Sequence, residues 1–285
     1  MSVLSEMLSS PLMVRGLIAA LLVGVTAPIV GTYLVQRRLA LLGDGIGHVA
    51  LTGVAMGWLA STWAEASDHD AWAIPGAVVA SVLGALMIEL VRSRGRTSAD
   101  VALALLFYGG IATGVLLMGI AGGSANNLTA YLFGSIATVS SADLVYITIL
   151  AAVILAVGIG LRPALFSLCH DEDFARACGL PVQFLNIVIA VVAALTVSVA
   201  MRVVGVLLVS AVMIVPVAVS QLVCRSFTGT MHSAMVISAV VCLSGLIITY
   251  MYPYSPGAVI VVLTIVLYAI VSVVRPLTSR LGAHP

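Results

Sequence analysis

Two side chains in the first third of the chain have the chemistry to bind a metal ion. Asp44 and His48 lie four residues apart in the apolar sequence GDGIGHVALTGVAMG. On a helix this spacing places both side chains on one face, one turn apart. A carboxylate oxygen and an imidazole nitrogen suit divalent transition metals such as zinc or manganese. The pair therefore predicts part of a metal path, because ionisable groups inside a membrane are costly and mark such paths. The alternative is a buried Asp–His hydrogen bond that only ties helices together.

Glycines crowd the same stretch, at positions 43, 45, 47 and 53. Glycine weakens a helix and also lets another backbone approach it closely. We therefore expect the helix around Asp44 and His48 to be either broken or packed tightly against a neighbour.

The composition of the chain defines its structural class. Of its 285 residues, 62% are hydrophobic and 8% are charged, whereas soluble domains carry about 25% charged residues. Apolar runs of about 20 residues recur, which is the length of a membrane-spanning helix. The sequence predicts an all-α, polytopic membrane protein whose residues 1–285 form a single transmembrane domain. It has no basic patch with interleaved aromatic residues, so binding to nucleic acid is set aside.

Nine apolar segments are expected to be membrane-spanning helices. An arrangement of eight spans, with one segment re-entrant, is the alternative. The expected segments are residues 13–35, 39–60, 74–91, 101–121, 143–161, 183–201, 203–222, 232–250 and 257–274.

The arginines predict how these segments are oriented. The chain has no lysine, and ten of its twelve arginines follow the odd-numbered segments, on one side of the membrane. Positive charge favours the cytoplasmic side. The N-terminus is therefore expected outside and the C-terminus in the cytoplasm. Arg202 is the exception, between segments six and seven at the outer side, and is expected there to meet an acidic donor protein or to snorkel.

The segment at about 163–182, between spans five and six, differs from the other connections. Its sequence HDEDFARACGL predicts a short helix with acids in its first turn and a glycine at its end. One side of this helix is apolar, as in elements that dock a soluble partner. An ordinary connector helix at the membrane surface is the alternative.

Four motifs in register resemble the permease subunits of ABC transporters for zinc, manganese and iron. The run RRLALLGDGIGHVALTGVAMG carries the Asp and His of that family. AYLFGSIATVSSADL resembles its outward loop, and DEDFARACGLPVQFLN resembles its coupling helix. VVGVLLVSAVMIVPVAVSQLVCRS, followed by YSPGAVIVV, resembles its last spans. The resemblance covers residues 12–275, roughly the whole chain.

This resemblance implies a type II-like ABC importer permease in the bacterial plasma membrane. It implies a permease homodimer, a cytoplasmic ATP-binding subunit that hydrolyses ATP, and an extracytoplasmic metal-binding protein. The chain itself has no GxxxxGK[ST] sequence and is not expected to be an enzyme. Asp44 and His48 would contact the transported ion, which is Mn²⁺, Zn²⁺ or Fe²⁺. Contact with the ATPase would involve a set of residues in the coupling segment: Asp171, Glu172, Asp173, Phe174, Ala175 and Gly179.

Two features leave alternatives open. The family's usual proline after the metal motif is Thr52 here, so the bend expected there is in question. Asp68, His69 and Asp70 form either a weak metal-collecting site or a solvated outer loop. A stand-alone, ion-coupled metal carrier or channel is the alternative function, and the coupling segment is the feature that such a protein would not need.

Overall fold

The computed structural model describes residues 7, 9–64, 72–94, 99–123, 125–135 and 139–281. Within these residues every regular element is helical, as expected. The helices are α2 (Pro11–Gln36), α3 (Leu42–Trp63), α4 (Ala73–Arg94), α5 (Ala99–Ile120), α6 (Ala125–Phe133), α7 (Ser141–Gly160), α8 (Arg162–His170), α9 (Glu172–Ala177), α10 (Val182–Ala200), α11 (Val209–Val223), α12 (Phe227–Met251) and α13 (Pro256–Leu281).

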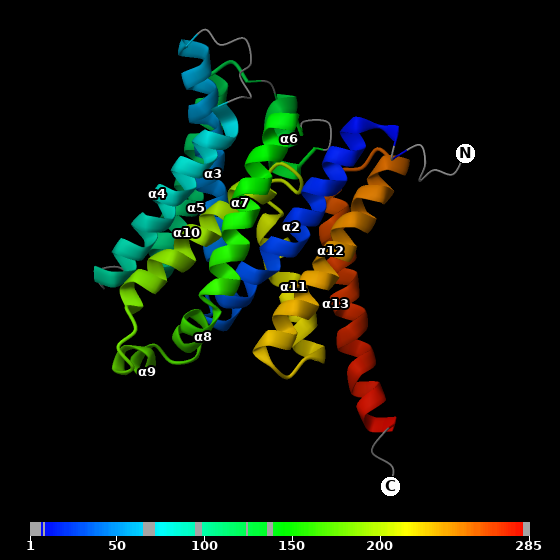
Figure 1. Cartoon of the computed structure of the whole chain (residues 1–285). Helices are drawn as coiled ribbons and strands as arrows, with labels where there is room; N and C mark the ends of the chain where they lie inside the picture. The colour runs from blue at the N-terminus through cyan, green and yellow to red at the C-terminus, as the bar shows by residue number, and fades with distance from the viewer. Residues whose placement is uncertain are drawn as a thin grey trace.

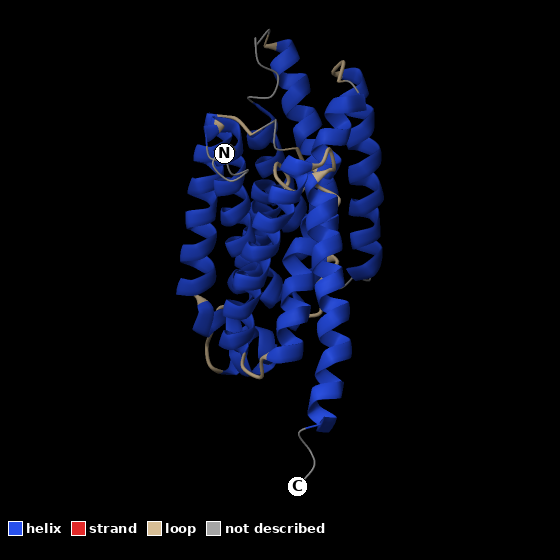
Figure 2. Cartoon of the chain, turned by 90° about the vertical axis from the view of Figure 1, so that its right-hand side faces the viewer, coloured by secondary structure: helices blue, strands red, loops and turns tan. Residues whose placement is uncertain are grey.

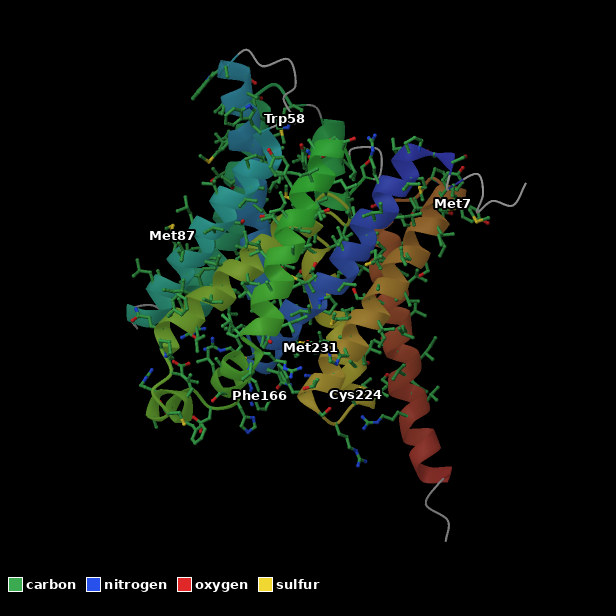
Figure 3. The ribbon with its side chains drawn as sticks, viewed as in Figure 1. Met7, Trp58, Met87, Phe166, Cys224 and Met231 are labelled. Atoms are coloured by element: carbon green, nitrogen blue, oxygen red, sulfur yellow. The ribbon has the colours of Figure 1, made fainter. Side chains whose placement is uncertain are left out.

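The long helices form a bundle whose successive members run in opposite directions (Figures 1 and 2). α2, α4, α7, α11 and α13 run toward the end that carries α8 and α9, here called the α9 end. α3, α5, α10 and α12 run toward the opposite end, which carries α6 and is called the α6 end. Figure 3 labels Trp58 near the α6 end and Phe166 and Cys224 near the α9 end. The start of α2 and the end of α13 therefore lie at opposite ends of the bundle.

Seven of the described helices are long and apolar enough to cross a membrane: α2, α4, α5, α7, α10, α12 and α13. The expectation of about nine spans is slightly high by this measure. The two remaining predicted segments are also helical, as α3 and α11. α11 has 15 residues, which rise about 22 Å and fall short of a hydrocarbon core of about 30 Å. It begins at Val209 rather than near 203, inside the bundle.

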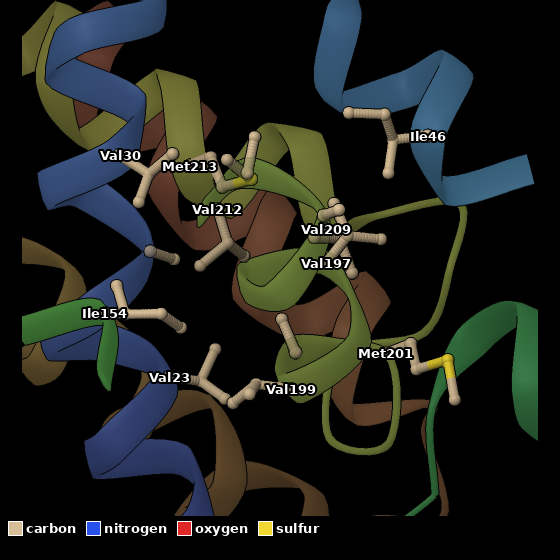
Figure 4. Close-up of a cluster of buried hydrophobic side chains, with 14 of the residues drawn as sticks. Val23, Val30, Ile46, Ile154, Val197, Val199, Met201, Val209, Val212 and Met213 are labelled. Carbon is tan, nitrogen blue, oxygen red and sulfur yellow. The ribbon is translucent and has the colours of Figure 1, made fainter. Parts of the chain in front are cut away.

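The hydrophobic core lies where α2, α10 and α11 meet. Figure 4 shows Val23 and Val30 of α2 facing Val212 and Met213 of α11, with Val199 of α10 beside them. All of these side chains are at most 2% exposed. By contrast, large apolar side chains such as Leu116, Ile149 and Ile265 are exposed on the outside of the bundle. Such a surface is suited to lipid rather than to water.

In the segment 201–208, between α10 and α11, residues 201–206 are buried and 207–208 half-buried, although the segment forms no helix. Non-helical backbone is tolerated at membrane depth only where protein groups satisfy it. Here the end of α6 does so: Val206 N–H donates to the Tyr131 carbonyl at 2.9 Å and Leu207 N–H donates to the Leu132 carbonyl at 3.2 Å. The backbones of Gly205 and Gly134 lie in contact, and both residues have positive φ, +89° and +77° respectively. A Cβ on Gly205 would lie 2.4 Å from Gly134 N, so the crossing needs glycine.

The expectation that Arg202 lies at the surface is wrong. Its side chain is 2% exposed and its guanidinium lies 3.5 Å from Asp143 of α7 and 5.2 Å from the centre of the Tyr131 ring. Sequence position placed it near the end of a span, but residues 201–208 fold into the bundle and take Arg202 with them. The buried carboxylate supplies the opposite charge that a buried guanidinium requires.

The contact between α2 and α11 provides a test of the packing. A Cβ on Gly31 would lie 1.8 Å from the carbonyl oxygen of Met213, a backbone atom that no side-chain rotation can move. Gly31→Ala is expected to destabilise the protein by at least about 1–3 kcal/mol, the usual cost of overpacking. The melting temperature of the protein in detergent measures this effect.

Gly109→Ala on α5 is the matched control, because a Cβ there meets no described atom within 4 Å. Its melting temperature should stay equal or rise slightly, since alanine favours helix by about 1 kcal/mol. Equal melting temperatures for the two variants would contradict the close approach of α2 and α11.

Candidate functional site

Asp44 lies in the first turn of α3 and lines an open pocket between α3 and α5. The pocket has a volume of about 280 Å³ and is bordered by Leu41, Asp44, Gly45, Leu103, Ala104, Phe107 and Tyr108. Among the described residues of this lining, Asp44 is the only charged side chain, and the others are apolar except for the tyrosine. Its Oδ1 accepts a hydrogen bond from Ser210 Oγ at 2.8 Å. Ser210 belongs to the first turn of α11, so the carboxylate also joins α3 to α11.

His48 lies one turn further along α3 and is 1% exposed. Its ring meets the ring of Phe107 edge-on, with 4.1 Å between centroids. Its Nδ1 has no hydrogen-bond partner among the described residues. Buried polar atoms in folded proteins are nearly always paired, so an unpaired ring nitrogen points to a ligand that takes this place.

The expected alternative, an Asp–His hydrogen bond, is not formed: Asp44 bonds Ser210, and His48 Nδ1 is unpaired. The two side chains therefore offer separate donor atoms to an ion. Phe107 both lines the pocket and contacts the His48 ring. Ser210 and Phe107 are parts of this site that the sequence did not reveal, because neither is near Asp44 in the chain.

α3 is unbroken through this region, so close packing rather than a break explains its glycine-rich sequence. The partner helix α5 supplies a glycine as well: a Cβ on Gly110 would lie 2.7 Å from the backbone carbon of His48. Thr52, at the position where the family has proline, donates its hydroxyl proton to the Gly110 carbonyl at 2.8 Å. Thr52 thus fastens α3 to α5 directly above the site.

Two protein ligands do not complete the coordination of a divalent transition metal, which takes four or more. Within the described part of the chain, no three His, Cys, Asp or Glu side chains gather in a group that could hold an ion. The Asp44–His48 pair therefore fits passage or transient binding of an ion, with other ligands completed by water or by a second molecule. The triplet Asp68, His69 and Asp70 lies outside the described residues.

The predicted coupling segment forms two helices at the α9 end, α8 and the shorter α9. The expected acid-rich helix is α9. Its three acids occupy different environments. Asp171 caps the helix, since its Oδ1 accepts from the N–H groups of Asp173 and Phe174 at 3.0 and 2.9 Å. The Glu172 carboxylate lies 3.1 Å from Arg37 and 3.4 Å from Arg176. The Asp173 side chain is 95% exposed.

The apolar residues of α9 are divided between an inner and an outer face. Ala175 is fully buried, whereas Phe174 is 61% exposed. Gly179 ends the helix in the left-handed conformation, with φ of +78°, and Leu180 N–H closes the turn on the Ala175 carbonyl at 3.1 Å. This is a common glycine-based helix ending. An exposed phenylalanine and an exposed acid thus project from a helix that is otherwise fixed to the bundle.

Comparison with known proteins agrees with a helical membrane transport protein. Residues 9–275 match the model of the ABC 3 transport family. The chain belongs to that family.

Among the curated relatives is the manganese transport system membrane protein MntC of Halalkalibacterium halodurans, 30% identical over 93% of this chain and 88% of the relative. Another is the chelated iron transport system membrane protein YfeD of Yersinia pestis, 28% identical over 98% of this chain and 92% of the relative.

Two solved structures are similar as well. PsaBC from Streptococcus pneumoniae, solved in complex with Fab, has a TM-score of 0.83 and 28% identity, and the match covers 94% of each chain. An inward-facing putative metal-chelate type ABC transporter has a TM-score of 0.65 and 17% identity over 91% of this chain and 85% of the other. The second match supports the fold alone.

The cap of α9 yields a prediction that separates the roles of its acids. Asp171→Ala should cost about 1 kcal/mol of local stability, the usual worth of such a cap. Amide hydrogen exchange across 171–180, measured by mass spectrometry, should then become about fivefold faster. Asp173→Ala removes a similar charge but no cap, and should leave exchange nearly unchanged. Equal exchange in the two variants would contradict the capping role.

Proposed function

We propose that this chain is the permease subunit of an ATP-driven importer for a divalent transition metal ion, Mn²⁺, Zn²⁺ or Fe²⁺. The observation that carries the proposal is the pocket between α3 and α5. It presents the Asp44 carboxylate to the surface of the subunit, beside a buried imidazole whose Nδ1 is unpaired. Family membership and relatives named for manganese and iron transport support the same substrate class.

The other components follow from what this subunit lacks. Its pocket supplies too few ligands for a complete site, so we propose that two permeases assemble as a homodimer and share the ion path. ATP would be hydrolysed by a separate cytoplasmic ATP-binding subunit. An extracytoplasmic metal-binding protein would deliver the ion. In this arrangement the ion is the substrate and passes through without a permanent site.

We propose that α9 is the docking element for the ATP-binding subunit. Its exposed Phe174 supplies an apolar anchor and Asp173 an exposed negative charge, while the buried Ala175 packs against the bundle. A stand-alone carrier would have no use for this element. The α9 end would then face the cytoplasm, in agreement with the arginines gathered there.

Replacing both Asp44 and His48 by alanine is expected to reduce metal uptake to background, because both donor atoms are lost. Uptake of manganese, zinc and iron is measured in cells that express the chain with its ATPase and binding protein. Thr264→Val on α13 is the control, because it also removes a buried polar group but one that bonds only its own helix. Normal uptake by the well-expressed double variant would refute the metal path, and undiminished uptake without the ATPase would favour a stand-alone carrier.

The orientation is tested by thiol labelling in intact cells. In a protein with Cys169, Cys224 and Cys242 replaced by serine, the exposed Cys178 beside α9 should react with a membrane-impermeant maleimide only after permeabilisation. A cysteine introduced by Ala64→Cys, together with Cys178→Ser, should react in intact cells, because residue 64 ends α3 at the α6 end. The reverse pattern would invert the model.

A further inference from the structure

Arg37 stands at the junction of three elements that the proposed mechanism must connect. It follows the last residue of α2, and its side chain is 8% exposed. One guanidinium nitrogen, Nη2, donates to Glu172 Oε2 of α9 at 3.1 Å, and the other, Nη1, donates to Asn186 Oδ1 of α10. The planar guanidinium can hold two partners at once in a fixed geometry, which a lysine cannot do. α2, α9 and α10 are therefore joined through one side chain.

The turn after Arg37 leads directly to the metal pocket. Arg38 has φ of +57°, and Leu39 N–H bonds the Leu34 carbonyl at 2.8 Å, which closes α2 in the same way that glycine closes α9. Leu42 N–H then bonds the Leu39 carbonyl at 3.0 Å as α3 begins. A non-glycine residue held in this conformation shows that the turn is firmly determined. A displacement of Arg37 is therefore transmitted through residues 38–41 to Asp44, which lies in the first turn of α3.

The surroundings of Arg37 are polar and partly open. A polar cavity of about 590 Å³ opens beside it, and its charged and amide lining includes Arg37, Glu89, Arg92, Glu172, Arg176 and Asn186. The Arg37–Glu172 pair lies in the wall of this cavity and not inside a packed core. Burial, and then the nearby charge of Arg92, lower the pKa of Arg37 from its ordinary value. Both influences disfavour the guanidinium ion, and the negative charges of Glu172 and Glu89 act in the opposite direction.

We infer that Arg37 is a positioning residue that transmits movement of α9 to the Asp44 pocket, through its simultaneous bonds to Glu172 and Asn186 and the short turn into α3. The inference rests on the proposed docking of the ATP-binding subunit at α9. It assigns Glu172 to the permease side of the connection, whereas Phe174 and Asp173 face the partner. When α9 moves, the Glu172–Arg37 ion pair moves the end of α2 with it, and the start of α3 follows.

The test uses the full permease with its ATP-binding subunit and metal-binding protein, reconstituted in liposomes. Three quantities are measured: retention of the ATPase, the rate of ATP hydrolysis, and manganese transported per ATP. Arg37→Gln should retain the ATPase and continue to hydrolyse ATP, but transport per ATP should fall roughly tenfold, within the range of coupling effects. A residue needed only for stability would lower all three quantities together.

Arg176→Gln is the matched control. Arg176 lies 3.4 Å from Glu172 and 3.7 Å from Asp173, but all three residues are on the same short helix and Arg176 is 65% exposed. Its loss removes an equal charge from Glu172 without disconnecting α9 from α2, so transport per ATP should change by less than about twofold. Glu172→Gln breaks the same bond from the α9 side without altering α2, and should reproduce the effect of Arg37→Gln even if that variant does not fold.

Exchange of the two charges provides a rescue. In the double variant Arg37→Glu with Glu172→Arg, the ion pair can re-form, and the Asn186 amide can donate where it formerly accepted. Transport per ATP should recover relative to either single variant. Unchanged coupling in both Arg37→Gln and Glu172→Gln would overturn the inference, as would loss of the ATPase from both. If the wild-type assembly transports no manganese, zinc or iron, the proposed function fails instead.

Discussion

Hydrocarbon offers no partner for a polar group, and this constraint governs the arrangement of the molecule. The end of α6 accepts the N–H groups of Val206 and Leu207 in the segment 201–208, and Arg202 lies beside the buried Asp143. Thr52 bonds a carbonyl of α5, and Ser210 bonds Asp44. By contrast, His48 Nδ1 has no hydrogen-bond partner among the described residues. This free bonding capacity is the observation on which the proposed metal path rests.

The sequence was informative wherever one segment carried its own signal. Length and apolarity located the long helices, because a span must satisfy its backbone within itself. The four-residue spacing of Asp44 and His48 correctly placed them one turn apart on α3. The acid start and glycine end of α9 were also readable, since capping depends on residues next to the helix.

Features that depend on distant parts of the chain could not be predicted in this way. Phe107 over His48 and Ser210 beside Asp44 result from packing of α5 and α11 against α3. From the sequence, Arg37 was used only to predict orientation, because no neighbouring residue indicates that it contacts Glu172 and Asn186. The same reason explains why α11 begins later than predicted. The run from 203 is apolar enough to continue a helix, but Gly205 and hydrogen bonds to the end of α6 favour a non-helical backbone there. Single-sequence patterns report local preference, whereas these outcomes were decided by tertiary partners.

The buried turn between α10 and α11 also constrains how the protein is made. A 15-residue α11 cannot bridge the bilayer alone, and the turn before it would expose unsatisfied N–H groups to lipid until Tyr131 and Leu132 were in place. α6, which carries these two residues, precedes residues 201–208 in the chain and is therefore synthesised before them. α10 and α11 would then leave the translocon as a single hairpin onto a prepared surface. The order of synthesis thus becomes part of the folding mechanism, since the carbonyl groups that accept these hydrogen bonds are synthesised before the N–H groups that donate them.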